Sequence, residues 1–253
     1  MIPIQILRVL STIRQYDVPA LLMGGQACVL YGAAEYSRDL DLAVLATGDA
    51  VPQLAAAVEA LHAVVIAVPP FEAQYLERGH AIHFSVPDPV ASPLRVDVMS
   101  RMRGVAPFDE LWSRRTTIDL DSPNGEGVCV DVMSLEDLVS AKKTQRDKDW
   151  PMLRRLVDAS YAAPSDDNPS AEQVEFWLAE LRSPEFLREA VSRFPGIAKH
   201  VTRPAVAAAL NDGDIPAALA AEQSHEMAAD REYWLPLRRE LEALRHAARR
   251  VEG

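Results

Sequence analysis

The sequence predicts an α+β fold over its first 160 residues, followed by an all-helical C-terminal domain. Two kinds of periodicity in the N-terminal part indicate this class. In several short segments apolar residues alternate with polar ones, which is the pattern of strands with one buried face. In others apolar residues recur every three or four positions, which is the pattern of helices with one buried face. Beyond residue 170 only the helical pattern occurs.

The N-terminal part is predicted to alternate between helices and strands. The predicted strands are 20–23, 40–44, 64–68, 82–86 and two copies of the pentapeptide VDVMS, at 96–100 and 130–134. The predicted helices are 4–16, 26–33, 51–61 and a helix after Ser134 that carries AKKTQRDKDW, stops or kinks at Pro151 and restarts as 152–160. Ser134 followed by Asp137 has the spacing of a capping box, so we expect that last helix to begin there.

A linker is predicted at residues 161–170, YAAPSDDNPS, which contain two prolines and little to bury. It separates a domain at 1–160 from a helical domain at 171–253. The helical patterns of the second domain cover 171–182, 186–194, 205–212, 215–229 and 232–250.

Composition excludes several classes of protein. The chain has 253 residues, and its 26 basic against 37 acidic residues give a net charge of -11, which argues mildly against binding nucleic acid over the whole surface. Cys28 and Cys129 belong to no CxxC pair or Cys/His cluster, so we expect neither a disulfide framework nor a zinc site, and a reducing cytoplasm is the default compartment. The first residues lack a signal-peptide pattern, and no apolar run approaches the 18 residues of a membrane span.

A candidate site begins at the segment LLMGGQACVLYGAAEYSRDLDLAVL. Here a strand runs into Gly24-Gly25, and glycines at a strand-to-helix turn let the backbone approach a phosphate closely. Asp39 and Asp41 follow on the next strand, and residues at i and i+2 of a strand project from the same face. Two carboxylates this close repel each other unless cations lie between them. One more carboxylate from a second strand would complete a two-metal site, with ions about 3.5–4 Å apart.

This combination resembles the DNA polymerase beta-like nucleotidyltransferase superfamily, whose first motif is Gly-Gly or Gly-Ser followed by D-x-D. The resemblance covers about residues 15 to 160 and implies a mixed sheet flanked by helices. It also implies a third carboxylate, alone on a following strand between apolar residues. Asp97 in the first VDVMS copy matches that place, and Asp131 in the second is the weaker candidate. Ser37, two residues before Asp39, also fits the group and is expected at the nucleotide.

The segment AKKTQRDKDWPMLRRL carries a local positive charge. Residues 142 to 155 include six basic and two acidic residues, which gives this segment a net charge of +4. On a helix, Lys142 and Arg146 would share one face. K-x-x-R-x-K-D after an SLEDL turn resembles the basic motif of AbiEii-like nucleotidyltransferases, which include toxins of type IV toxin–antitoxin pairs. The resemblance implies that Lys142 or Lys143, together with Arg146, contacts the nucleotide triphosphate, and that Lys148 and Asp149 support them. The sequence leaves open which lysine faces the site.

The expected activity is therefore transfer of a nucleoside monophosphate from an NTP to an acceptor hydroxyl, with two Mg²⁺ ions as cofactors held by Asp39, Asp41 and Asp97. Gly24 and Gly25 would hold the phosphates. The acceptor stays open between an RNA 3′ end, tRNA above all, and a small hydroxylated molecule such as an aminoglycoside; a protein hydroxyl is a third option. A cognate antitoxin is a possible partner. The alternative from another class is a nucleotide- or partner-binding module without turnover. His83 is expected to be structural.

Overall fold

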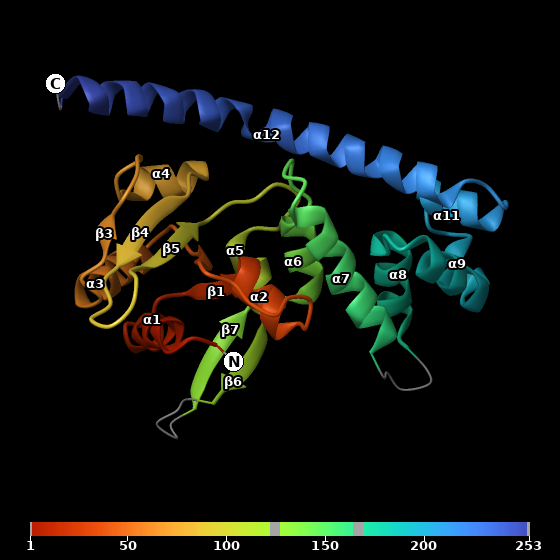
Figure 1. Ribbon diagram of the computed structural model, residues 1–253, viewed down its shortest axis with the longest axis horizontal. Helices are drawn as coiled ribbons and strands as arrows, with labels where there is room; N and C mark the ends of the chain where they lie inside the picture. Colours follow the sequence, from red (N-terminus) through yellow and green to blue (C-terminus); the bar gives the residue numbers. More distant parts are fainter. Residues whose placement is uncertain (1, 122–126, 164–168, 252–253) are drawn as a thin grey trace. The chain divides into compact units, whose positions relative to one another are not determined.

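The computed structural model describes residues 2–121, 127–163 and 169–251 (Figure 1). The chain divides into two compact units. The first comprises the residues up to Leu30, Ala34–Leu138 and the chain from Trp234 onwards. The second comprises Tyr31–Ala33 and Val139–Tyr233.

The first unit is built on one mixed sheet of seven strands. The strand order is β3-β4-β5-β2-β1-β7-β6. The strands are β1 Ala20–Met23, β2 Leu40–Val44, β3 Val64–Val65, β4 Ile82–Val86, β5 Leu94–Met99, β6 Thr116–Leu120 and β7 Val128–Val132. The β1–β7 and β2–β5 pairs are parallel, and the other four pairs are antiparallel. This confirms the predicted α+β class with a mixed sheet.

The helices of the described chain that belong wholly to this unit are α1 Ile4–Gln15, α2 Gly24–Leu30, α3 Ala50–Ala60, α4 Ala73–Arg78 and α5 Phe108–Ser113. Helix α1 has one buried face, as its periodicity predicts: Leu7, Leu10 and Ile13 are buried, whereas Ile4, which the same spacing placed with them, is exposed. The centre of the sheet is its most buried part, since Leu21 and Leu22 of β1 have no exposed surface. The strands that carry the candidate site are thus anchored by the core of this unit.

Several elements differ from the prediction. The strand expected at 64–68 is limited to Val64–Val65 at the open edge of the sheet, although the Ile66 amide still donates to the His83 carbonyl at 2.9 Å. Helix α2 begins at Gly24 itself rather than after the glycines. Elements α4, α5 and β6 were not predicted: the two helices are only six residues long, which is less than two turns, and β6 has no buried residue that would give it an apolar face.

The segment after the second VDVMS copy begins as predicted and then departs from the prediction. Helix α6, Leu135–Ala141, begins after Ser134, whose hydroxyl accepts a hydrogen bond from the Asp137 amide at 3.2 Å. The helix ends at Ala141, and α7, Asp149–Ala162, begins only after a turn. The predicted continuous helix through AKKTQRDKDW is therefore wrong. Pro151 lies in the first turn of α7, where its missing N–H costs no helical hydrogen bond.

Beyond residue 170 the regular elements of the described chain are all helices, as predicted, and most of them belong to the second unit. Besides α7, that unit contains α8 Ala171–Glu180, α9 Pro184–Arg193, α10 Pro195–Ala198, α11 Pro204–Leu210 and the first part of α12 Ile215–Val251. Two separate helices were predicted where α12 runs uninterrupted past Pro236. Helix α7 extends through Ala162, into the first residues of the linker predicted at 161–170. Residues 164–168 of that linker lie outside the described residues, so the linker stays a prediction.

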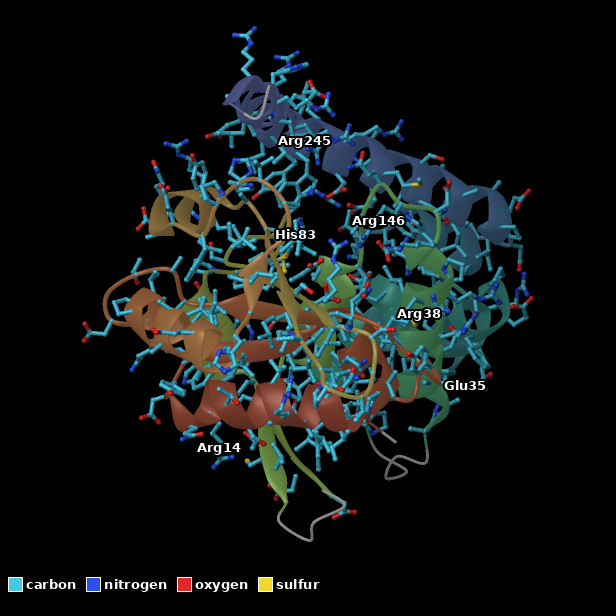
Figure 2. The ribbon with its side chains drawn as sticks, turned by 60° about the vertical axis from the view of Figure 1, so that its left-hand side comes forward. Arg14, Glu35, Arg38, His83, Arg146 and Arg245 are labelled. Carbon is cyan, nitrogen blue, oxygen red and sulfur yellow. The ribbon has the colours of Figure 1, made fainter. Side chains whose placement is uncertain are left out.

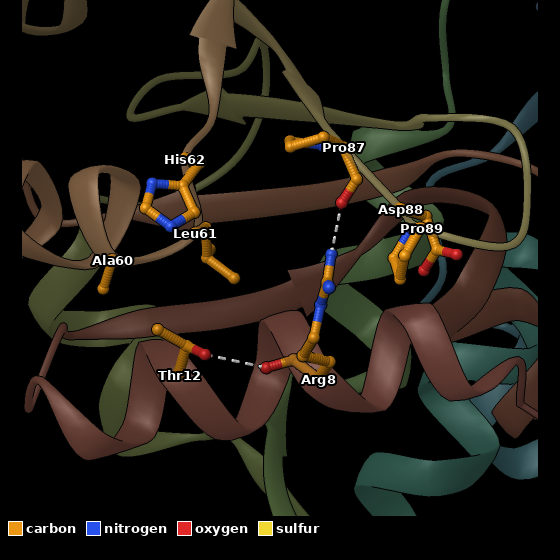
Figure 3. Close-up of a pocket in the computed structure, with 8 residues that line it drawn as sticks. All are labelled: Arg8, Thr12, Ala60, Leu61, His62, Pro87, Asp88 and Pro89. Carbon is orange, nitrogen blue, oxygen red and sulfur yellow. Dashed lines mark hydrogen bonds between the residues drawn. The ribbon is translucent and has the colours of Figure 1, made fainter.

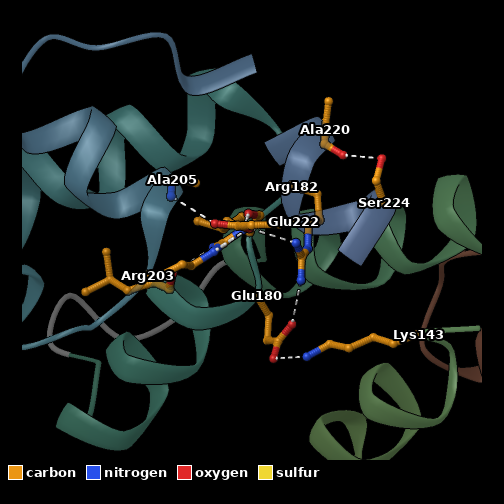
Figure 4. Close-up of polar contacts among 10 residues, drawn as sticks. Lys143, Glu180, Arg182, Arg203, Ala205, Ala220, Glu222 and Ser224 are labelled. Atoms are coloured by element: carbon orange, nitrogen blue, oxygen red, sulfur yellow. Dashed lines mark hydrogen bonds and ion pairs between the residues drawn. The ribbon is translucent and has the colours of Figure 1, made fainter. Parts of the chain in front are cut away.

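A network of charged side chains holds the helices of the second unit together (Figure 4). Glu222 of α12 accepts hydrogen bonds from Arg182 at 2.9 Å and from Arg203 at 3.0 Å. Arg203 also donates to the carbonyls of Leu178 and Leu181, both at 2.8 Å. Burial, and then the charge of Arg182, lowers the pKa of Arg203. A buried network of this kind is costly to break, so we assign it a structural role.

Within the described residues, no helix combines the length and the apolar character that crossing a membrane requires.

Candidate functional site

Two of the three predicted carboxylates are neighbours in the sheet. Asp41 of β2 is in register with Asp97 of β5, its parallel neighbour. Residues in register on adjacent strands point to the same side of a sheet, so both side chains leave the same face. Asp39 lies in a bend one residue before β2. The strand order thus places the first VDVMS copy beside the D-x-D motif.

Gly24 and Gly25 lie close against Asp41 and Ser37, where a side chain on either glycine would not fit. A Cβ at Gly24, whose φ is +65°, would overlap the carboxylate of Asp41, and one at Gly25 would overlap the hydroxyl of Ser37. The Gly25 amide donates a long hydrogen bond, 3.4 Å, to Asp41 Oδ2. Both glycines are therefore required for the close approach of α2 to Ser37 and Asp41. The sequence predicted that the glycines lie against phosphate, whereas in this structure they lie against Asp41 and Ser37.

Asp97 is held by two side chains of its own sheet face. Arg95, two residues before it on β5, contacts both carboxylate oxygens, with Nε at 2.8 Å from Oδ1 and Nη2 at 3.0 Å from Oδ2. His83 of β4, in register with Asp97, places Nδ1 2.8 Å from Oδ1. This face is polar: Asp41, His83, Arg95 and Asp97 share it, while Val96 between the last two is buried on the other.

The charged groups around Asp97 shift one another's pKa values. Burial pushes the pKa of Asp97 up, but the hydrogen bonds from His83 and Arg95 outweigh it and hold that pKa below its usual value. The hydrogen bond to Asp97, followed by the charges of Asp97, Asp39 and Asp41, raises the pKa of Arg95. All three carboxylates therefore act on one guanidinium.

Sequence reasoning missed Arg95 and gave His83 a structural role only. The signal for Arg95 was present in LRVDVMS, because alternation along a strand puts the arginine and the aspartate of R-x-D on one face. No such local signal existed for His83. Its contact with Asp97 depends on the register between β4 and β5, which are separated by the connector at residues 87–93. His83 is labelled in Figure 2.

The donors fit a divalent cation in kind but not in their present arrangement. Carboxylate oxygens are the ligands that Mg²⁺ prefers. Within residues 2–121, 127–163 and 169–251, however, no three or more His, Cys, Asp or Glu are grouped so that they could hold a metal ion. Both oxygens of Asp97 are engaged by Arg95. The cation now at these carboxylates is the guanidinium.

The second VDVMS copy lies elsewhere in the sheet. Asp131 belongs to β7, and β1 separates that strand from β2. The Asp131 carboxylate accepts hydrogen bonds from Arg115 Nε at 2.8 Å and from the Thr117 hydroxyl at 2.9 Å. The two copies are alike locally, but only Asp97 is a neighbour of Asp41.

The basic residues predicted to bind the triphosphate lie in the turn between α6 and α7, so they do not share a helix face. Arg146 Nε lies 2.8 Å from Asp149 Oδ2, and Lys142 Nζ lies 3.7 Å from Asp149 Oδ1. Lys143 Nζ lies 2.5 Å from Glu180 Oε1 (Figure 4). The side chain of Asp149 is only 6% exposed, and it also accepts a hydrogen bond from the Thr144 hydroxyl at 2.5 Å. Asp149 thus organises the turn from the start of α7.

A pocket of about 390 Å³ lies between α1, the end of α3 and the residues after β4 (Figure 3). Its lining residues are Arg8, Thr12, Ala60, Leu61, His62, Pro87, Asp88 and Pro89. Arg8 reaches across to donate to the Pro87 carbonyl at 2.6 Å. None of the predicted site residues lines this pocket.

No protein-family model and no curated protein sequence matches this chain. Among solved structures, the chain is similar to an antigenic nucleotidyltransferase-like protein from Paracoccidioides brasiliensis. The two share 16% sequence identity with a TM-score of 0.42, over 77% of this chain and 89% of that chain. At this TM-score the similarity carries no argument about the activity of this chain.

Proposed function

We propose that the chain is a nucleotidyltransferase, which transfers a nucleoside monophosphate from an NTP to an acceptor hydroxyl and releases pyrophosphate. One observation carries the proposal. Asp41 and Asp97 leave the same sheet face in register, with Asp39 two residues before Asp41. The close approach of α2, made possible by Gly24, fixes the position of Asp41.

Each acid has a task in this reaction. Asp39 and Asp41 would hold the cations that accompany the NTP, and Asp97 would share in holding one of them and help to deprotonate the acceptor hydroxyl. When bound, divalent cations offset the charge of the leaving pyrophosphate and lower the pKa of the acceptor hydroxyl. Neither task requires a histidine base, so His83 acts through Asp97 as a positioning residue.

The basic turn would receive the triphosphate. Arg146 and one of Lys142 and Lys143 are the proposed contacts, and each now pairs with Asp149 or Glu180. A triphosphate carries more charge than a carboxylate, so it would compete for these side chains once it arrives. The narrower hypothesis of an AbiEii-like toxin with a cognate antitoxin belongs to this proposal and depends on the sequence resemblance.

An RNA acceptor is favoured over a small molecule by the C-terminal part of α12. Residues 238–250 contain five arginines and two glutamates, a net charge of +3 in a chain of -11. Leu237, Leu241 and Leu244 are partly buried. The five arginines are all exposed: Arg238, Arg239, Arg245, Arg249 and Arg250 (Arg245 is labelled in Figure 2). Exposed arginines along one helix are suited to a phosphate backbone.

The experiment measures pyrophosphate release from each NTP with Mg²⁺ and either bulk tRNA or an aminoglycoside panel. Asp41→Asn keeps the size of the side chain that α2 packs against and removes its charge. We expect release with tRNA from the wild type and its loss by at least about 10²-fold in the variant. Full turnover in Asp41→Asn would refute the proposed site, and turnover only with aminoglycosides would refute the RNA acceptor.

A further inference from the structure

A second group of polar side chains lies outside the proposed nucleotidyltransferase site, around the pocket of about 390 Å³ in the first unit (Figure 3). Helix α1 contributes Arg8 and Thr12, the residues after α3 contribute His62, and the segment after β4 contributes Asp88. A guanidinium, a hydroxyl, an imidazole and a carboxylate therefore line one cavity. A few polar groups that converge on a cavity of this volume are typical of a small-molecule site.

Arg8 is held in a fixed direction at this pocket. Its Nη2 donates to the Pro87 carbonyl at 2.6 Å. A guanidinium carries five N–H groups, so this contact orients the side chain and leaves N–H groups for a ligand. Arg8 is exposed, so a ligand can reach it from solvent. An oriented, accessible guanidinium is suited to bind an oxyanion, either a carboxylate or a phosphate.

His62 lies just beyond the end of α3, at the same pocket. Its backbone is left-handed, with φ +51°, a conformation that is uncommon for a residue with a side chain. The Ala63 amide donates to the Val58 carbonyl at 3.0 Å, which closes a helix end where glycine is the usual residue. A glycine here would leave the pocket without an imidazole. The ring N–H of His62 can donate to an anion that Arg8 also contacts.

Asp88 lies on the other side of Arg8 from His62 (Figure 3). Its Oδ1 accepts hydrogen bonds from the amides of Val90 and Ala91, at 3.0 and 2.9 Å, which fixes the carboxylate at the wall of the pocket. A carboxylate repels an anion, so the anionic group of a ligand is expected on the side of His62. From a neutral hydroxyl group, in contrast, Asp88 can accept a hydrogen bond.

The Thr12 hydroxyl is a further acceptor. It donates to the Arg8 carbonyl, one turn earlier on α1, at 2.9 Å, so its oxygen keeps lone pairs for a ligand hydroxyl. Of the described residues that line the pocket, only Leu61 is buried, so little enclosed apolar surface is offered to a hydrocarbon ligand. The pocket thus fits a molecule that is rich in hydroxyl groups and carries one anionic group.

We propose that this pocket binds a hydroxylated small molecule with one oxyanion, of the class of sugar phosphates and sugar acids. Arg8 and His62 hold the oxyanion, and Asp88 and Thr12 accept hydrogen bonds from the hydroxyl groups. The inference goes beyond the proposed function and does not depend on it, because none of these residues is among those proposed to bind the NTP, the cations or the acceptor.

The test is a ligand-observed NMR titration of the full chain with glucose 6-phosphate, gluconate and glucose. The three probes share a hydroxylated body, and glucose lacks the anionic group. We expect at least one of the two anions to bind with a Kd of about 1 mM or lower, and glucose to bind at least about tenfold more weakly. Binding of only one anion supports the inference and identifies the oxyanion as a phosphate or a carboxylate.

Arg8→Gln should weaken binding of the anion by about tenfold, because a hydrogen bond from a charged donor is lost. Arg14→Gln is the matched control. Arg14 is also an exposed arginine of α1 that donates to a backbone carbonyl, that of Cys129 at 3.0 Å, but it does not line the pocket. Its loss changes the net charge equally, so we expect wild-type affinity there.

Should Arg8→Gln fail to fold, His62→Gly carries the test. Glycine adopts the left-handed backbone of His62 without strain, so this variant should keep a Tm close to that of the wild type and bind the anion at least about threefold more weakly. Unchanged affinity in either variant or an equal loss in Arg14→Gln would overturn the inference. Equal binding of glucose, or no binding of either anion to the wild type, would overturn it as well.

Discussion

The two VDVMS copies offer a matched pair of substitutions, Asp97→Asn and Asp131→Asn. Each removes one charge from the same pentapeptide and keeps the size of the side chain. Only Asp97 lies beside Asp41. We therefore expect Asp97→Asn to lower pyrophosphate release by about 10²- to 10⁴-fold, the usual contribution of a positioned proton acceptor. Asp131→Asn should retain activity within about twofold.

The stability cost of each change follows from the contacts. Asp97 accepts hydrogen bonds from His83 and Arg95, and Asp131 from Arg115 and Thr117. A hydrogen bond to a charged group is worth about 1 kcal/mol more than a neutral one, but both arginines are partly exposed and solvent screens them. We expect about 1–2 kcal/mol for Asp97→Asn and about 1 kcal/mol for Asp131→Asn. For a chain of this size, 1 kcal/mol lowers Tm by about 2–4 °C.

The assay compares initial rates of pyrophosphate release at saturating NTP with Tm from thermal unfolding. Because the stability costs are similar, a difference in rate between the variants reports the site rather than the fold. Equal activity in both variants, or greater loss in Asp131→Asn, would refute the assignment of Asp97.

Two further predictions concern the diglycine and the helical unit. Gly24→Ala should destabilise the chain by about 2–4 kcal/mol in urea unfolding and reduce pyrophosphate release, because a Cβ there meets both a strained φ and the carboxylate of Asp41. Gly48→Ala, with φ +60° and no atom near its Cβ, should lose only about 1 kcal/mol, and an equal loss at both would contradict the close approach. Burial, and then the hydrogen bond with Glu189, raises the pKa of Tyr161, so its contribution is complete below the unfolded pKa of about 10 and is lost as pH rises through the folded value. Urea unfolding from pH 8 to 11.5 should show the wild type losing stability relative to Tyr161→Phe above pH 10, and a constant difference would contradict this.

Local patterns predicted most of the fold where an element is long enough to show a period. The helix at 4–16 and the strands at 20–23, 40–44 and 82–86 differ from α1, β1, β2 and β4 by no more than one residue. The prediction failed at residues 142–148, which carry strong helix formers yet form a turn. Asp149 accounts for this, because its contacts with Lys142, Thr144 and Arg146 stabilise the turn. A helical-periodicity argument does not weigh such side-chain contacts.

The sequence predicted only part of the arrangement around Asp41 and Asp97. The D-x-D spacing predicted that Asp39 and Asp41 share a strand face, but Asp39 lies in a bend before β2 and only Asp41 is on the strand. Arg95 beside Asp97 is local in the same sense and was overlooked. The contact of His83 with Asp97, by contrast, depends on strand pairing across a connector.

By itself the sequence determined which faces of the strands are apolar, where the capped helix begins, and that each VDVMS copy turns its aspartate away from its valines. These features follow from chain geometry over two to four residues. Only the tertiary structure decided which aspartate neighbours Asp41, because that depends on β5 and not β7 pairing with β2. It also decided that an arginine contacts both oxygens of that aspartate, since strand order and register are set by the burial of the whole sheet and not by the pentapeptide.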